Sequence, residues 1–530
     1  MASRRDELNA YNFARKRTVG AFLQPGGGGN DEDAPRPVRA VLPSFVVGAV
    51  IVAGFGMWGV IKPSAPVNWD DGKNIIQGKD STTRYVVLED PTSHEKFLHQ
   101  VLNMSSAKLV LPAGSKVVQV ADSVLDAYKN HGATIGIPYA PDRLPGSDDA
   151  GDAKKWSVCD RPGSDASQAT INQAVFVAAD QDAKNLAKPD LVLSEGQGLY
   201  VQAPPIRKDV DASKFLVDMN GVKHAVGEVS LTGARRSAME SGLFGDQVQP
   251  QQVTQAWLDT LATGAPIKFP EIPGFSKDSK IKSQVKLPAN QAVVGHLLHF
   301  QNTYYVVGKT KLVAITPFQA ELIRNDPDLS VAYGAGVTPK VDELSPASNA
   351  ELSGDVDQSI MDKSDVPDAK PLPPVNVGPK ATRSVICSTF EGYVQGQIKR
   401  TVWASSDYPA KVSTGSASAH VTPGHGLLYR AVDGDGGSGT QDTSGSTFLI
   451  TETGLRYSLQ ANGDGGAAGT PDPTPSPQQQ QAQAGSQDDD AKARLGFKSV
   501  NPVLVPLPWS VLVPGGGVLN SKAAEQAQSA

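Results

Sequence analysis

Three short motifs contain residue types that can support chemistry, and each of them is incomplete. Gly308-Lys309-Thr310 ends like a phosphate-binding loop, but Thr303 stands where the first glycine of that motif belongs. We therefore expect a turn between two strands at this point. Asp433 to Gly437 resembles the start of a calcium loop, yet Gly437 and Ser444 occupy the positions of the third oxygen ligand and of the terminal glutamate. The motif is interpreted as part of a flexible linker.

The histidines show no spacing that is typical of a metal site. His296 and His299 are three residues apart, without the glutamate of an H-E-x-x-H motif, in a stretch (293–307) that is predicted as a strand and hairpin. The chain also lacks a G-x-S-x-G nucleophile elbow. The sequence therefore predicts no catalytic residue, no cofactor and no metal.

The elements that surround these motifs must be short. The chain has 530 residues, including 52 Gly and 39 Pro, with only 39% hydrophobic and 6% aromatic residues. This composition predicts several domains of the α+β class with many turns, not a large helical core. A net charge of −6 argues against a nucleic-acid partner, and two cysteines exclude a Cys₄ zinc site.

The chain contains an internal duplication. Phe215-Leu216-Val217 and the following Gly221 to Val226 match Phe448-Leu449-Ile450 and the following Gly454 to Leu459. Each string predicts a strand, a tight turn with glycine, and a second strand. The later positions Val248, Pro250, Val253, Trp257 and Gly264 recur at a constant offset of 252, and Gly196 to Leu199 recurs at an offset of 228 as Gly424 to Leu427.

Weaker copies of the hairpin and helix precede each cysteine, with hairpins near 84–87 and 304–315 and helices at 120–128 and 318–323. We therefore expect two similar halves, about 65–270 and 285–520, related by an approximate two-fold axis. Cys159 and Cys387 are also 228 residues apart. Equivalent residues of two copies touch only near the axis, so a Cys159–Cys387 disulfide would join the halves at their centre. Two unrelated buried thiols are the alternative.

One segment is long and apolar enough to cross a membrane. Residues Ala40 to Ile61 contain no charge, and at about 1.5 Å per residue they span roughly 33 Å. Trp58 lies near one end, where aromatic residues favour the membrane interface. A signal peptide usually has a shorter apolar region nearer the terminus. We expect a single membrane anchor, with residues 1–39 in the cytosol and the long body outside.

The preceding tail predicts a helix with an apolar face. Leu8, Tyr11, Val19 and Phe22 fall on one side, interrupted by Arg15. Two interpretations stay open: a solvated basic helix that rests on anionic lipid, and a docking helix for a cytosolic partner. Residues 337–380 and 461–492, which are rich in Pro, Asp, Ser or Gln, are predicted as spacers.

Several strings resemble those of the EccB family, the single-pass core component of the actinobacterial type VII (ESX) secretion machine. The strings span nearly the whole chain: Arg4-Arg5-Asp6-Glu7-Leu8, Leu102 to Leu109, Gly136 to Pro141 with Leu144-Pro145, Trp156 to Asp160, Gly454 to Tyr457, and Pro514 to Gly517 with Leu519. The departures are the acidic and proline-rich spacer, the Gln-rich insertion and Gly517-Val518 in place of Pro-Ala.

The resemblance implies a cytosolic tail, one transmembrane helix and an elongated extracytoplasmic body, in which a central β-rich domain is flanked by four small α/β repeats similar to a phage-lysin binding subunit. It also implies the Cys159–Cys387 disulfide. The implied partners are an EccC-like ATPase related to FtsK and SpoIIIE, an EccD-like multi-spanning subunit and other EccB copies, with the tail helix as a docking element.

These observations favour a non-enzymatic scaffold subunit of a type VII secretion complex in the cytoplasmic membrane. The alternatives are a membrane-anchored hydrolase, for example of nucleotides, and a module that binds peptidoglycan or another part of the envelope. The predicted organisation is a cytosolic tail at 1–39, a transmembrane helix at 40–61, repeats at 62–145, 213–270, 301–336 and 447–520, a central domain from 146–212, 271–300 and 381–446, a linker at 337–380, a disordered insertion at 461–492 and a tail at 521–530.

Overall fold

The computed structural model describes most of the chain. The described residues are 3–23, 38–61, 65–163, 170–186, 188–205, 213–228, 231, 233–334, 337–346, 348, 352, 354–379, 381–412, 417–433, 445–459 and 490–528. The structure divides into two compact units: the smaller holds 1–69, 76–82 and 118–129, and the larger holds 70–75, 83–117 and 130–530.

The smaller unit contains three helices among its described residues. They are α1 (Arg4–Leu23), α2 (Val38–Ile61) and α4 (Asp122–Asp126). Strands β1 (Ile75–Gly78) and β4 (Val117–Val120) fall mainly in this unit, where the Lys79 amide donates to the Val120 carbonyl. Over the described residues, no helix combines the length and the apolar character that crossing a membrane requires.

Three sheets of the larger unit share one topology. In each, three consecutive antiparallel strands form the middle, and a later short strand pairs in parallel with each outer one. The sheet of the second repeat is β10 (Gln251–Gln252), β7 (Leu199–Gln202), β8 (Lys214–Val217), β9 (Val222–Ala225), β11 (Ala262–Thr263). The sheet of the third repeat is β15 (Val341–Glu343), β12 (Leu297–Phe300), β13 (Thr303–Val307), β14 (Leu312–Ile315), β16 (Val356–Asp357). The sheet of the fourth repeat is β23 (Val503–Pro506), β20 (Leu427–Val432), β21 (Thr447–Ile450), β22 (Arg456–Leu459), β24 (Gly515–Leu519).

The first repeat follows the same plan. Strands β2 (Arg84–Glu89) and β3 (Lys96–Gln100) form an antiparallel hairpin, and parallel bridges join Leu98 to His131 and Val101 to Ile135. These bridges take the place that β11 has in the second repeat. The described hairpin of the first repeat and its parallel bridges therefore match β8, β9 and β11 of the second repeat.

Short helices lie between the outer strands of the repeats, and a last one, α14, follows β24. In the larger unit they are α3 (Met104–Val110), α7 (Gly233–Phe244), α8 (Gln255–Asp259), α9 (Pro317–Asn325), η1 (Pro327–Leu329), α10 (Ser330–Tyr333), α13 (Leu507–Ser510) and α14 (Ser521–Ala524). Helix α9 begins with a capping box, in which Thr316 and Gln319 each accept from the other's backbone amide, and this explains its sharp start.

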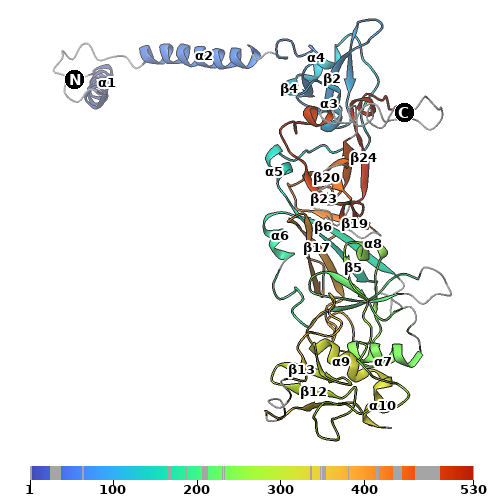
Figure 1. The fold of residues 1–530 in the computed structure, drawn as a ribbon. Helices are drawn as coiled ribbons and strands as arrows, with labels where there is room; N and C mark the ends of the chain where they lie inside the picture. The colour runs from blue at the N-terminus through green and yellow to red at the C-terminus, as the bar shows by residue number, and fades with distance from the viewer. Residues whose placement is uncertain are drawn as a thin grey trace. The chain divides into compact units, whose positions relative to one another are not determined.

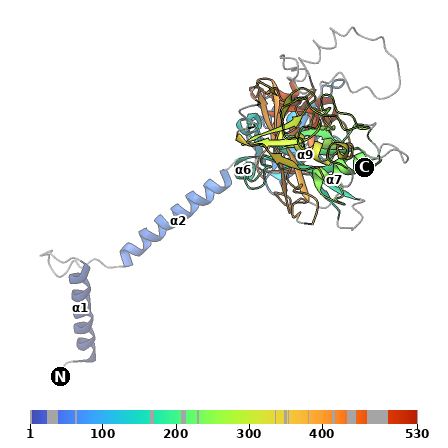
Figure 2. The same ribbon diagram turned by 60° about the horizontal axis from the view of Figure 1, so that its bottom comes forward.

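A fifth sheet lies at the centre of the larger unit (Figure 1). Its order is β18 (Gln397–Ser405), β17 (Val385–Val394), β5 (Lys155–Pro162), β6 (Ile171–Ala178), β19 (Ala417–Val421). In Figure 1 this sheet lies between the fourth-repeat sheet and helices α7 and α9, and in Figure 2, where the bottom of Figure 1 comes forward, α7 and α9 lie toward the viewer. Helices α5 (Ser147–Gly151) and α6 (Asp180–Asn185) precede and follow its first hairpin.

The repeats of the larger unit pack in pairs. The first and fourth share a core in which α3 contacts α14, and the Ser521 hydroxyl donates to the Leu109 carbonyl at 2.9 Å. The second and third meet through α7 and α9, with a two-point ion pair between Arg235 and Asp326. Each half of the chain therefore contributes one repeat to each pair.

The α+β class is confirmed, and several strands belong to a repeat although they lie outside the bounds expected for that repeat. Strand β7 belongs to the second repeat although it lies within 146–212, and β20 belongs to the fourth although it lies within 381–446. Strands β15 and β16 pair with the third repeat, so 337–380 is more than a linker. Residues 271–300 supply β12 to the third repeat and no strand to the central sheet. The insertion expected at 461–492 lies almost wholly outside the described residues.

Candidate functional site: the centre of the duplicated body

The two halves of the chain meet in the antiparallel pair of β5 and β17. Cys159 lies opposite Cys387, and the sulfur atoms are bonded to each other. One step away, Asp160 faces Ile386 and Val158 faces Ser388. Because Asp160 and Ser388 are 228 residues apart, as are Val158 and Ile386, exchanging the halves reproduces the same pairs. A local two-fold axis therefore passes through the disulfide, as the sequence predicted.

The surroundings of the disulfide are buried, and several of their polar side chains are hydrogen-bonded, although the buried Ser388 hydroxyl beside Cys387 has no partner among the described residues. Both cysteines are fully buried, together with the Trp403 side chain. The Trp403 indole donates to the Thr389 hydroxyl at 2.9 Å, and that hydroxyl donates to the Ser157 hydroxyl at 2.8 Å. Buried polar groups cost free energy when they lack partners, so these two hydrogen bonds allow the side chains of Trp403, Thr389 and Ser157 to pack beside the disulfide.

Asp160 connects the central sheet to the second repeat. Its fully buried carboxyl accepts from the backbone and hydroxyl of Thr254, at 2.7 and 2.8 Å, and from the Gln173 amide at 3.0 Å. Thr254 also caps helix α8 through the Trp257 amide. Burial raises the pKa of Asp160 to about 6, because desolvation of the charge outweighs these hydrogen bonds.

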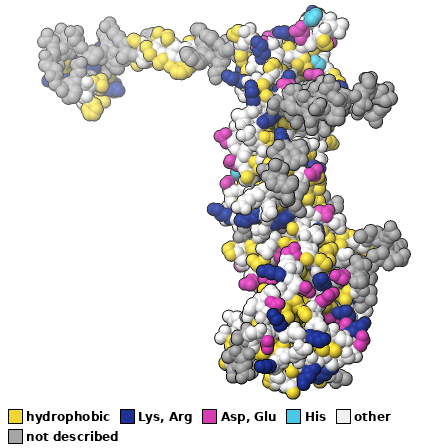
Figure 3. Space-filling view, viewed as in Figure 1, with side chains coloured by type: hydrophobic (Ala, Val, Ile, Leu, Met, Phe, Trp, Pro, Cys, Tyr) yellow, Lys and Arg dark blue, Asp and Glu magenta, His cyan; other side chains and the backbone are white. Residues whose placement is uncertain are grey.

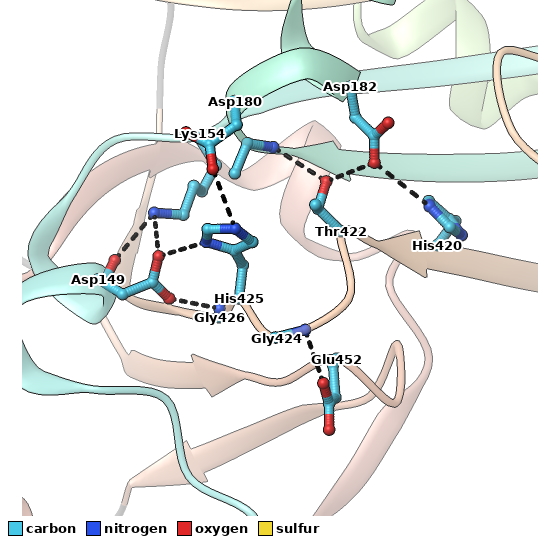
Figure 4. A network of polar contacts seen from close by, with 11 residues as sticks. Asp149, Lys154, Asp180, Asp182, His420, Thr422, Gly424, His425, Gly426 and Glu452 are labelled. Atoms are coloured by element: carbon cyan, nitrogen blue, oxygen red, sulfur yellow. Dashed lines mark hydrogen bonds and ion pairs between the residues drawn. The ribbon is translucent and has the colours of Figure 1, made fainter.

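A second polar cluster joins the central domain to the fourth repeat (Figure 4). On α5, the Asp149 carboxylate accepts from the Lys154 ammonium at 2.9 Å, from the His425 ring at 2.6 Å and from the Gly426 amide at 2.9 Å. Only 5% of the Lys154 side chain is exposed. Burial opposes ionisation of Asp149, but the bonds from His425 and Lys154 outweigh it and lower its pKa.

The same cluster extends to helix α6. The second nitrogen of His425 lies 3.2 Å from the Asp180 carboxylate, and Thr422 donates to Asp182 at 2.9 Å. On the other side of the loop, the Gly424 amide donates to the Glu452 carboxylate at 2.7 Å. One loop between β19 and β20 is therefore tied to α5, to α6 and to the turn after β21. We name this cluster of Asp149, Lys154, Asp180, Asp182, Thr422, Gly424, His425, Gly426 and Glu452 the junction network.

The junction network occurs in one half only. At the matching positions, Gln197 stands for His425 and Val377 for Asp149. The chain after Lys370 instead runs beside the second repeat, where the Leu372 amide donates to the Gly196 carbonyl and the Val375 amide donates to the Gly198 carbonyl. The two halves thus share a backbone plan but use different side chains at this junction.

The chemistry that the junction network can perform is limited. Both side-chain contacts of His425 in the described structure are carboxylates, and the nearby Thr422 hydroxyl is bonded to Asp182. No serine, threonine or cysteine is therefore placed as a nucleophile on His425 within the described residues. The search of those residues also finds no group of three or more His, Cys, Asp or Glu that could hold a metal ion. The geometry is that of a structural clamp.

Two of the incomplete motifs occupy ordinary structural positions, and the third, Asp433 to Gly437, lies outside the described residues except for Asp433. Gly308-Lys309-Thr310 forms the turn between β13 and β14, with the Gly308 amide donating to Lys311, so a strand follows it instead of a helix. His296 and His299 contact the carboxylates of Asp342 and Glu343 on the neighbouring β15. The turn predicted at Gly308 and the strand predicted at His299 are confirmed, whereas His296 lies one residue before β12 and after a turn, so the strand predicted there is wrong.

A cavity of about 390 Å³ lies beside the second repeat, between its strands and residues 364–374. Phe244 and Phe318 contribute to its apolar wall, and Asp218 and Asp365 to its polar wall. No lysine or arginine is among its described lining residues. Because nucleotide phosphates need cations or converging amides, this cavity does not fit a nucleotide.

The predicted docking residues lie exposed on α1. The side chains of Leu8, Tyr11, Val19 and Phe22 are exposed by 63%, 69%, 44% and 88%, and Arg15 is exposed between them. The predicted anchor residues Ala40, Trp58 and Ile61 lie within α2, and their side chains fall outside the described part of the chain.

Sequence comparison matches the whole chain to a known family. The family model described as "Type VII secretion system ESX-1, transport TM domain B" covers residues 1–530. A protein named "ESX-3 secretion system ATPase EccB3" from Mycolicibacterium smegmatis (strain ATCC 700084 / mc(2)155) is 23% identical over 491 residues, which are 89% of this chain and 80% of the relative. The protein of the same name from Mycobacterium tuberculosis (strain CDC 1551 / Oshkosh) is 25% identical over 508 residues, which are 90% of this chain and 81% of the relative.

Solved structures share the fold. The chain resembles one in the "Structure of an intact ESX-5 inner membrane complex, Composite C3 model", with a TM-score of 0.55, 19% identity, and coverage of 100% of this chain and 96% of that one. It also resembles a chain in the "Structure of EccB3 dimer from the ESX-3 core complex", with a TM-score of 0.56, 20% identity, and coverage of 86% and 100%.

Proposed function

The chain belongs to the EccB family, the transport component B of type VII secretion systems, and we propose that it acts there as a non-catalytic scaffold. The observation that carries this proposal is the local two-fold at the Cys159–Cys387 disulfide, which makes one cross-linked body of four repeats. A buried, cross-linked centre of this kind would hold the repeats in one body to which other subunits can bind.

Helix α2 is proposed as the membrane anchor. The support is the uncharged stretch of residues 40–61, whose length matches a hydrocarbon core of about 30 Å. The body after residue 61 would lie outside the cytoplasmic membrane, because long domains translocate largely regardless of flanking charge. Structurally similar chains come from inner membrane complexes, which agrees with a membrane-bound place for this one.

Helix α1 is proposed as the docking element on the cytosolic side. Its exposed apolar residues have no partner within the described structure of α1, and such a face is typically covered by another protein. The proposed partners are an EccC-like ATPase and an EccD-like multi-spanning subunit. Other copies of this chain are proposed as partners of the outer body, since a related chain was solved as a dimer.

The docking role can be tested with two matched variants of the full chain. The triple variant L8A/Y11A/F22A removes the apolar face of α1, and N9A/K16A/R17A changes the opposite face by the same number of residues. After extraction in mild detergent, the first variant should lose the EccC-like ATPase while it still associates with wild-type copies of the chain. Unchanged co-purification of the ATPase would contradict the docking role.

Nucleotide hydrolysis is the second candidate, because the relatives are named as ATPases. The Gly308 turn and the acidic cavity beside the second repeat do not favour it. The full chain, purified away from the EccC-like subunit, should release phosphate from ATP no faster than the detergent blank. Turnover that persists through several columns and scales with the amount of this chain would replace the scaffold proposal.

A further inference from the structure

The fourth repeat has a sheet edge made of glycine. Strand β24 begins with Gly515, Gly516 and Gly517, and it is the outermost strand of its sheet, next to β22. Gly515 lies opposite Arg456 in a parallel register, and the Arg456 amide donates to the Pro514 carbonyl at 2.9 Å. In this register the amide and the carbonyl of Gly515 itself point away from β22. Gly515 and Gly516 are exposed, so solvent reaches the outer side of the strand.

A shared glycine identifies the equivalent edges of two other repeats. In each of three repeats, one glycine lies against an aromatic ring that leaves no room for a Cβ. The pairs are Gly132 with His99, Gly264 with His224, and Gly516 with Tyr457. These glycines therefore mark the same position in the first, second and fourth repeats, and the segments beside them can be compared.

In the first and second repeats another segment of this chain covers the edge. Ile135, three residues after the shared glycine, forms an antiparallel bridge with Ala527. In the second repeat the Asp365 carboxylate accepts from the amide of Ala265, the residue after the shared glycine, at 2.9 Å. The backbone of these two edges is therefore hydrogen-bonded on its outer side.

The edge of β24 has no such cover within the described chain. Among those residues, no hydrogen bond reaches the outward amide or carbonyl of Gly515, and Pro514 does not block this side because its backbone faces β22. Natural sheets usually protect an open edge with a charged side chain or a proline. Figure 3 shows charged side chains spread over the surface of the larger unit, whereas Gly515 and Gly516 have no side chain. The edge is therefore free to pair with another strand.

An exposed tyrosine lies beside this edge. The Tyr457 ring packs on Gly516, and its hydroxyl donates to the Tyr139 carbonyl at 2.9 Å. Tyr139 is 89% exposed and has a φ of 60°, which residues other than glycine rarely adopt. The buried side chains of Asn103 and Ser105 bond to the backbone two residues before it and two residues after it. The fold thus holds a large ring in solvent, and such rings supply much of the energy of protein interfaces.

We propose that β24 pairs edge to edge with β24 of a second copy of this chain, across a two-fold axis at Gly515. A residue on such an axis exchanges both of its backbone hydrogen bonds with its own copy, as in a hydrogen-bonded antiparallel pair. Because every side chain at the axis meets its own copy, a charged residue there would repel itself, and glycine avoids this repulsion. The inference rests on the proposed association of copies through the outer body and assigns that association to one surface.

The contact is small, and two features compensate for its size. The register of β24 shifts between the partners of Arg456 and Ser458, so only a short stretch of strand can pair. Tyr139 of each copy adds the burial of a large ring. The proposed anchors place the copies in one membrane, which raises their effective concentration and allows a weak contact to persist.

Cysteine replacement at the proposed axis tests this pairing. In an antiparallel pair of this kind the two Cα atoms are about 5.5 Å apart, which is within the range of a disulfide. The variant G515C should keep the fold, because a Cβ at 515 meets no atom within 4 Å, and the native cysteines are already bonded to each other. The control T263C places a thiol at the equivalent exposed position of β11 in the second repeat.

The full chain is reconstituted in phosphatidylcholine vesicles, oxidised mildly and separated on a non-reducing gel. G515C should form the covalent dimer roughly tenfold faster than T263C, because only its thiols are held beside each other. Adding Y139S to G515C should slow the cross-link roughly fivefold, because the exposed ring is lost. Adding V394S, which removes an exposed side chain of the central sheet, should leave the rate within about twofold.

Two outcomes would overturn the pairing of β24. Equal rates for G515C and T263C would show that the thiols meet by random collision. A G515C variant that stays monomeric, while a lysine-reactive cross-linker still joins copies of the chain, would place the contact on another surface and leave the proposed association of copies intact. If the lysine-reactive cross-linker also finds no dimer, that association fails as well.

Discussion

Replacing Cys159 and Cys387 by alanine, singly and together, should show how far the cross-link stabilises the outer body. Both side chains are fully buried and face each other across the β5–β17 pair. Each single variant breaks the disulfide and leaves one free thiol, and the double variant removes that thiol as well. The backbone pairs on either side, such as Asp160 with Ile386, remain available in all three variants.

The expected loss follows from the length of chain that the disulfide closes. With a sequence separation of 228, the chain-entropy relation gives about 5 kcal/mol, which is an upper estimate because denatured chains retain structure. We expect each single variant to lose about 3–5 kcal/mol of unfolding free energy. The double variant should lose about the same amount, within about 1 kcal/mol, since the cross-link can be removed only once.

The measurement is urea unfolding of the full chain in mild detergent, followed by tryptophan fluorescence, to which the buried Trp156 on β5 and Trp403 on β18 contribute. Thiol labelling of the denatured, unreduced wild type provides the control and should find no free cysteine. Losses that simply add in the double variant would show that sulfur packing, not the cross-link, supplies the stability. A loss below about 1 kcal/mol in every variant would refute the role of the disulfide as the joint between the halves.

Three further predictions concern the surrounding contacts. Burial raises the pKa of Asp160 from 3.8 to about 6, so the stability linked to its protonation is complete below pH 3.8 and is lost as pH rises through 6. Urea unfolding should show the difference between wild type and D160N change by about 2 kcal/mol from pH 4 to 7. The pKa of Asp149 is lowered in the folded protein, so D149N should reduce the free energy of unfolding by about 1–3 kcal/mol at pH 7. This loss should shrink as pH falls through the folded pKa of Asp149, and an undiminished loss at low pH would contradict the ion pair with Lys154. Gly454 and Gly221 lie at equivalent turns of the fourth and second repeats, and G454A should lower the thermal midpoint more than G221A. A Cβ at 454 would clash with the Ala419 carbonyl oxygen at 2.4 Å, whereas a Cβ at 221 would have its nearest contact, with the Arg400 side chain, at 3.3 Å. Equal shifts of the two midpoints would contradict this prediction.

The duplication made the centre of the fold predictable from sequence. Cys159 and Cys387 share the offset of Gly196 and Gly424, and equivalent residues meet only on the axis that relates the copies. The limits of the repeats were harder to predict. Strands β7 and β20 have only 4 and 6 residues and are separated from their hairpins by loops of unequal length, so no local pattern assigned them to the repeat that follows.

The junction network shows what the sequence could not reveal. Asp149 and His425 are 276 residues apart, and no motif or period relates them. Gly424 to Leu427 was recognised as a match to Gly196 to Leu199, but the match drew attention to the shared glycines and not to the histidine between them. A contact that exists in one copy only leaves no trace in a comparison of the copies, so only the fold identifies it.

The unequal junctions distinguish the two ends of a pseudo-symmetric body. A duplicated chain with identical junctions would present the same surfaces at both ends, and partners could bind in either direction. Here Asp149 and Lys154 clamp the fourth repeat through His425. The second repeat is held instead by backbone hydrogen bonds to residues 372–375, by the Asn376 side chain on the Tyr200 backbone and by Asp160 on Thr254. The first and fourth repeats also pack as one pair and the second and third as another. Side chains at the junctions therefore make the two ends different while the shared backbone and the central disulfide keep them in one body.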